Sequence, residues 1–166
     1  MLASCASSPA GAPAVPVSAP AAFPAFSAAE VAWSTAAGSA TVLGVARVGA
    51  NTMHTCASAE AQLVPESSFA TAMMHTVFGN ATRGYVTIAS SPPYPHTIPP
   101  DFPRSIRRVA CTPSGEYRFE AVPAGTWYLF ANVVWREGND EVPRGGSLMR
   151  RIEVHERTEL RVVLQP

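Results

Sequence analysis

Lysine is absent from this 166-residue chain, and charged residues of every kind are scarce. Asp, Glu, Lys and Arg together make up 14% of the residues, against roughly 25% in an average soluble domain. The 12 basic residues are all arginines, a bias that we attribute to GC-rich coding, and 12 acidic residues balance them to a net charge of +0. Nucleic-acid binding requires a basic surface that neutralises phosphates, so this composition argues against that class.

Long hydrophobic runs are also missing. No stretch of about 18 apolar residues occurs, so no segment is predicted to span a membrane as a helix. Hydrophobic residues still make up 47% of the chain, which is enough for the core of one small domain. We find no Ser/His/Asp arrangement and no glycine-rich phosphate loop. The sequence therefore favours a module without catalytic residues, and we expect no cofactor and no metal.

The first 37 residues consist largely of Ala, Pro and Ser. Each proline removes a backbone donor and fixes φ, so neither a helix nor a sheet ladder runs through closely spaced prolines. We expect residues 1–37 to form a disordered, partly polyproline tether and residues 38–166 to form one folded domain. The prolines that define the tether are Pro9, Pro13, Pro16, Pro20 and Pro24.

The tether begins with a short motif, Leu2-Ala3-Ser4-Cys5, that resembles a bacterial lipobox. In such motifs the cysteine becomes the lipidated first residue of the mature protein. The resemblance implies that Cys5 is a lipid anchor and that the protein belongs to the bacterial cell envelope, in the periplasm or at the outer membrane. It also implies that the membrane is contacted through the lipid alone.

The folded part carries strand signals, which are short β-rich segments separated by Gly, Pro and Asn turns. One exception is 68–78, where apolar residues recur at helical spacing between a possible cap at Ser68 and a stop at Gly79. The pattern predicts an all-β, Ig-like sandwich of about seven strands with one short helix. The strand candidates are residues 39–47, 55–64, 85–88, 106–111, 116–120, 126–135, 148–154 and 160–164.

Residues 111–129 carry a recognisable pattern: a turn with Gly115, the strand motif Tyr117-x-Phe119, then Pro123-x-Gly125 and an aromatic strand. This run resembles the core of carboxypeptidase regulatory-like domains, a family with a transthyretin-like β-sandwich. The likeness extends over residues 38–166, apart from 66–105. It implies a non-catalytic module that binds, scaffolds or accompanies other proteins. Its partner would be an envelope protein or a glycan.

A metal-dependent enzyme is the alternative on a related sandwich. Intradiol dioxygenases share a similar turn-Tyr-x-Phe run and hold iron with two Tyr and two His. After Gly125 this chain has only His155 and no His-x-His pair. Transthyretin-like hydrolases end in Tyr-Arg-Gly-Ser, whereas this chain ends in Val-Leu-Gln-Pro. The sequence therefore disfavours both enzyme families.

Cys56 and Cys111 lie at the ends of two strand candidates, and an exported chain would join them in a disulfide, leaving Cys5 for the lipid. Two alternatives remain open at this stage. In the first alternative, the two cysteines are buried thiols that form no bond. In the second, they bind zinc together with His54 and His75.

Arg104, Arg107 and Arg108 form a basic cluster after a proline-rich stretch. Such a cluster suits an anionic ligand, and we name these residues as a candidate binding site. A charged edge strand explains the same pattern without any ligand.

Overall fold

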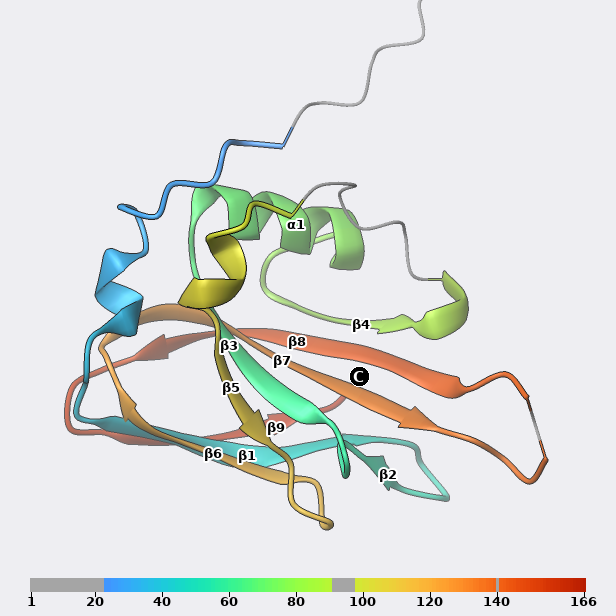
Figure 1. The fold of residues 1–166 in the computed structure, drawn as a ribbon. Coiled ribbons are helices and arrows are strands. Elements are labelled where there is room, and N and C mark those ends of the chain that lie inside the picture. Colours follow the sequence, from blue (N-terminus) through green and yellow to red (C-terminus); the bar gives the residue numbers. More distant parts are fainter. Residues whose placement is uncertain (1–22, 91–97, 140) are drawn as a thin grey trace, which may run out of the picture.

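The computed structural model describes residues 23–90, 98–139 and 141–166. Within them, two β-sheets pack face to face, and one α-helix lies on the outer face of one sheet (Figure 1). The predicted all-β sandwich is thus confirmed. The described residues form nine strands, rather than about seven.

The first sheet is built around β1 (Ala40–Val48). This strand pairs antiparallel with β6 (Glu116–Val122) and parallel with β9 (Glu159–Leu164). The short β2 (His54–Thr55) pairs with the last residues of β1. Because β9 follows β1 by more than a hundred positions, the centre of this sheet joins the two ends of the folded chain.

The second sheet is antiparallel throughout and has the order β4-β8-β7-β3-β5. The long hairpin of β7 and β8 forms its middle. Its strands are β3 (Glu60–Pro65), β4 (Arg83–Thr87), β5 (Arg107–Ala110), β7 (Gly125–Trp135) and β8 (Arg144–Val154).

Side chains of β7 contribute to two cores, as expected for a central strand. Trp127 and Leu129 are fully buried between the sheets, whereas Tyr128 is fully buried on the opposite face, beneath the helix. Val134 departs from this pattern with 48% of its surface exposed, because the outer layer does not extend to this end of the strand.

Helix α1 (Ser68–Phe78) has the predicted bounds. Its N-cap is Ser67, one residue before the expected Ser68, and the Ser67 hydroxyl accepts a hydrogen bond from the Ala70 amide at 3.1 Å. Gly79 ends the helix in the left-handed conformation, as expected. Three short 3-10 helices complete the described secondary structure: η1 (Ala32–Thr35), η2 (Ile88–Ser90) and η3 (Phe102–Ser105). Among the described residues, no helix has the length and apolar character needed to cross a membrane.

The expected end of the tether at residue 37 is wrong. Val31 is 3% exposed, and the Trp33 ring packs edge-on against Trp127 at 4.9 Å between centroids. Phe23 and Phe26 pack against Phe69 of α1. The domain therefore includes residues 23–37, and the remainder of the predicted tether, with Cys5, lies outside the described residues.

Two strand predictions also need correction. The candidate 55–64 is two strands, because the chain turns between Cys56 and Ala59, with Ser58 at a φ of 66°. The candidate 148–154 begins earlier, at Arg144, so the Gly145-Gly146 pair lies inside β8 and pairs with Val134 and Val133. Gly115 and Gly125 do have the positive φ that their turns suggest, 79° and 149°.

Cys56 and Cys111 form the predicted disulfide, with Cα atoms 5.9 Å apart. The bond connects the segment between β2 and β3 to the end of β5, across 55 residues. A loop of this length stabilises a fold by about 4 kcal/mol in the chain-entropy model.

Candidate binding surface

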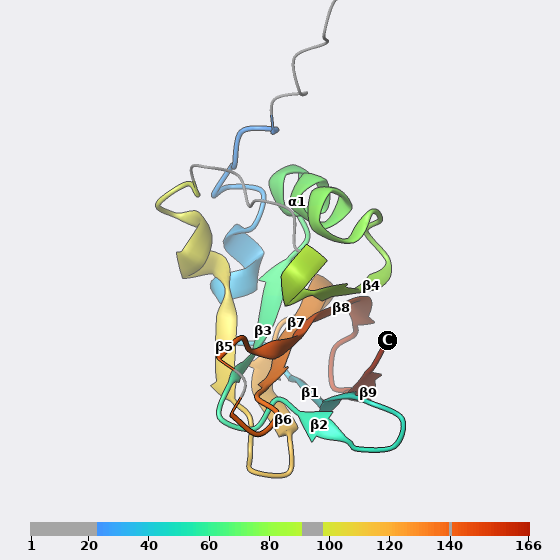
Figure 2. The same ribbon diagram turned by 90° about the vertical axis from the view of Figure 1, so that its right-hand side faces the viewer.

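The outer faces of the two sheets differ. Helix α1, η3 and the N-terminal segment cover the second sheet, whereas no helix of the described residues covers the first sheet (Figures 1 and 2). The outward-facing side chains of β1, β6 and β9 therefore meet solvent. We call this surface the open face.

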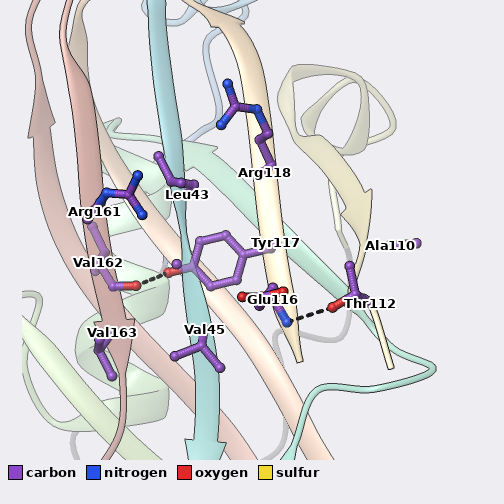
Figure 3. Close-up of a pocket in the computed structure, with 11 residues that line it drawn as sticks. Leu43, Val45, Ala110, Thr112, Glu116, Tyr117, Arg118, Arg161, Val162 and Val163 are labelled. Atoms are coloured by element: carbon purple, nitrogen blue, oxygen red, sulfur yellow. Dashed lines mark hydrogen bonds between the residues drawn. The ribbon is translucent and has the colours of Figure 1, made fainter. Parts of the chain in front are cut away.

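A depression of about 620 Å³ lies on the open face. Leu43 and Val45 of β1 lie along its middle, and Val163 of β9 adds an apolar side chain with 41% of its surface exposed (Figure 3). This volume falls within the range of about 300–1,000 Å³ typical of small-molecule sites. Alternation along β1 explains the floor, because Val42 and Ala46 point inward to the core, whereas Leu43 and Val45 point outward.

Charged side chains flank the apolar floor and pair with one another. The Arg118 guanidinium lies 2.9 Å from Glu120 and 3.9 Å from Glu159. Arg161 lies 2.7 Å from the same Glu159. About half or more of each side chain is exposed, so the pairs contribute little stability. Their effect is to hold two guanidinium groups, on β6 and β9, at either side of the floor.

Beneath the floor, the side chain of Tyr117 connects β6 to β9 across β1. Its hydroxyl passes under Gly44 and donates a hydrogen bond of 2.6 Å to the Val162 carbonyl (Figure 3). A Cβ on residue 44 would lie 1.7 Å from that carbonyl oxygen and 2.7 Å from the Tyr117 hydroxyl. Burial raises the pKa of Tyr117, so the phenol stays a neutral donor across the physiological range. The three strands of the open face therefore have a fixed spacing.

The open face presents both apolar and polar groups to a ligand. It offers apolar contacts, two positioned guanidinium groups, the Glu116 carboxylate and the Thr112 hydroxyl. Within residues 23–90, 98–139 and 141–166, no group of three or more His, Cys, Asp or Glu side chains is arranged to hold a metal ion.

The three predicted arginines are not brought together. Arg107 and Arg108 are adjacent on β5, so their side chains leave opposite faces of the sheet. Arg107 donates to the Ala121 carbonyl at 2.7 Å, and Arg108 donates to the Pro103 carbonyl at 3.1 Å. Arg104 pairs with Asp101 at 2.8 Å. Each guanidinium therefore has an intramolecular partner, and a shared ligand for the three stays a prediction.

The zinc alternative is wrong as stated, because the disulfide occupies both thiols it required. His54 lies instead on Trp135, with the rings parallel and 4.0 Å apart.

Sequence reasoning missed the residues of the open face. Their only signal is the period-two alternation of Glu116, Arg118 and Glu120, which we interpreted as evidence for a strand and not for a site. Leu43, Val45 and Val163 are ordinary strand residues, and nothing local distinguishes a solvated sheet face from a covered one.

The architecture is that of a two-sheet sandwich with one covered and one open face. No family model matches the chain, and no curated protein matches it. A solved structure from Pseudomonas aeruginosa, described as a "putative carbohydrate binding protein", has the same fold. The two share 18% identity at a TM-score of 0.73, over 87% of this chain and 100% of the other. At this identity the similarity establishes the fold alone.

Proposed function

We propose that this chain is a non-catalytic, exported binding module that takes saccharides of the cell envelope on its open face, and that a lipid at Cys5 anchors it. The observation that carries the proposal is the depression over β1, where an apolar floor lies between two arginines held in place. Saccharides present apolar C–H faces and many hydroxyls, and such a floor with flanking donors and acceptors can meet both.

Two further findings support the proposal. The fold neighbour from Pseudomonas aeruginosa carries a carbohydrate-binding description, which favours a glycan over an envelope protein as the partner. The Cys56–Cys111 disulfide suits an oxidising compartment, such as the periplasm or the cell surface. The resemblance to carboxypeptidase regulatory-like domains agrees with an accessory role for the sandwich.

A saccharide array tests the proposal directly. We expect the purified chain to bind a subset of bacterial envelope glycans and peptidoglycan fragments. Leu43→Glu and Val163→Glu place a carboxylate on the floor and should each weaken binding at least about tenfold, which corresponds to about 1.4 kcal/mol. Thr76→Glu, on the exposed face of α1, is the matched control and should bind like the parent chain.

Three results would contradict the proposal. The first is an array on which no saccharide binds. The second is binding that both floor variants leave unchanged while they remain folded by circular dichroism. The third is the appearance of new reducing ends in a bound saccharide, because turnover would make the protein an enzyme.

A further inference from the structure

A second hollow, of about 300 Å³, lies at the open edge of the sandwich, where β4 and β8 of one sheet meet the end of β9 in the other. Arg83, Arg150 and Arg151 line it, together with Thr82 and Gln165. Val163 lines both this hollow and the depression of the open face. The two therefore lie on either side of β9.

Arg83 and Arg150 are direct cross-strand partners in the β4–β8 ladder. Side chains at paired positions lie on the same face of a sheet, and like charges placed opposite one another are destabilising. Leu148 and Ile152, two positions away from Arg150 on either side, both belong to the core between the sheets. Arg150 therefore points toward the interior, and it reaches solvent because β9 is the last strand of the facing sheet.

Neither guanidinium has a hydrogen bond or an ion pair with an acidic group anywhere in the described part of the chain. The contrast with the neighbouring Arg151 is direct, because Arg151 makes a bidentate pair with Glu66 at 2.7 and 2.9 Å. The fold thus places two positive charges side by side without the acidic partner that it supplies to Arg104, Arg118, Arg144, Arg151 and Arg161.

We infer that Arg83 and Arg150 bind the anionic group of an acidic saccharide, the inference resting on the proposed saccharide function. Two adjacent guanidinium groups match the oxygens of a carboxylate or a phosphate. Hydrogen-bonding groups for the sugar hydroxyls beside it come from Thr82 and Gln165, and from the edge of β9 that no described strand pairs with. A saccharide chain that lies on the open face and passes over β9 would bring its acidic group to this pair.

Calorimetric titration of the whole chain tests the inference, with trigalacturonate as the acidic probe, glucose 6-phosphate as the phosphorylated one and maltotriose as the neutral one. Arg83→Gln and Arg150→Gln should each weaken binding of the charged probe about tenfold, as for a hydrogen bond to a charged group. Arg157→Gln is the matched control, because Arg157 is an exposed arginine on the turn between β8 and β9 and lies outside the hollow. Arg83→Gln and Arg150→Gln should not lower the thermal midpoint, because each removes the repulsion between the two paired arginines.

The two charged probes separate the sources of the anion, and tighter binding of either over maltotriose supports the inference. Unchanged affinity in both glutamine variants would overturn it. Inorganic phosphate that binds as tightly as the charged saccharides would also overturn it, because the site would then recognise an ion alone. Variants that only aggregate, with affinity unchanged, would show that the pair protects the edge strand β4 against pairing. Leu43→Ala distinguishes this failure from that of the proposed function, because it removes apolar floor without adding charge and should weaken acidic and neutral probes alike.

Discussion

Gly44 shows how a single residue shapes the proposed binding surface. It lies where the Tyr117 hydroxyl crosses β1 to reach the Val162 carbonyl, and the space there excludes any Cβ. The spacing of β6, β1 and β9, and hence the floor of the depression, depends on this close approach.

Substitutions at this crossing should be costly. We expect Gly44→Ala to lower the free energy of unfolding by about 1–3 kcal/mol, as overpacking does. Tyr117→Phe removes one buried hydrogen bond and should cost about 1 kcal/mol. Urea denaturation of the two variants measures both values. Parent-like stability of Gly44→Ala would show that the strands can move apart and that the floor is not rigid.

At the residue scale the sequence predicted only part of the structure. The disulfide was predictable because the chain has two cysteines at the ends of strand candidates, and the positive φ of Gly115 and Gly125 because turn patterns are local. The role of Gly44 was not, because it depends on the pairing of β1 with β9, and no local pattern encodes that partner.

Among the elements, the N-terminal segment differs most from expectation. Its described part, residues 23–37, contains no strand and only the short η1, yet its apolar side chains dock on the domain. Glu30 accepts hydrogen bonds from the Ser68 amide at 2.8 Å and the Ser68 hydroxyl at 3.1 Å, at the start of α1. Backbone propensity indicates which secondary structure a segment can form. It does not indicate where the segment lies, because tertiary contacts such as that of Trp33 with Trp127 decide this.

Truncation tests the docking of this segment. A chain that begins at residue 38 loses the buried Val31 and the Trp33 contact, and its free energy of unfolding should fall by about 3 kcal/mol or more. The matched control begins at residue 23 and keeps every described contact. Equal thermal midpoints for the two chains would argue that the segment contributes nothing.

Glu66 directly follows β3 and contacts side chains of β7 and β8. Its ionisation therefore makes the stability of the fold depend on pH. The hydrogen bond from Arg151 of β8 holds the pKa of Glu66 below its ordinary value of 4.5, and Tyr128 of β7 also donates to it, at 3.2 Å. Because the folded-state pKa is lowered, the stabilisation is present above pH 4.5 and is lost as the pH falls through the folded value.

Arg151→Gln measures this contribution. At pH 7 the variant should be less stable by about 1 kcal/mol, a modest value because both side chains are partly exposed. The difference from the parent should shrink below pH 4.5, where Glu66 becomes protonated in the unfolded chain. A difference that is constant from pH 7 to pH 3 would exclude the ion pair as its source.

For the whole molecule, both the disulfide and the proposed lipid anchor at Cys5 require that the chain be exported. When the gene is expressed in a bacterial host that modifies lipoproteins, we expect labelled palmitate to enter the protein and the Cys5→Ser variant to lose the label. The variant should move from the membrane fraction to the soluble fraction while the Cys56–Cys111 bond persists, as non-reducing peptide mapping would show. Absence of label from the parent chain would remove the anchor and leave the binding module unaffected.

In the proposed function the open face, and not the helix-covered one, receives the ligand. Amide chemical-shift mapping tests it most directly, by titration of the labelled protein with the saccharide that binds most strongly on the array. We expect shifts that cluster on β1, β6 and β9, with Leu43, Val45, Arg118 and Val163 among the largest. Shifts confined to α1 and η3 would contradict it, because the ligand would then occupy the covered side of the sandwich.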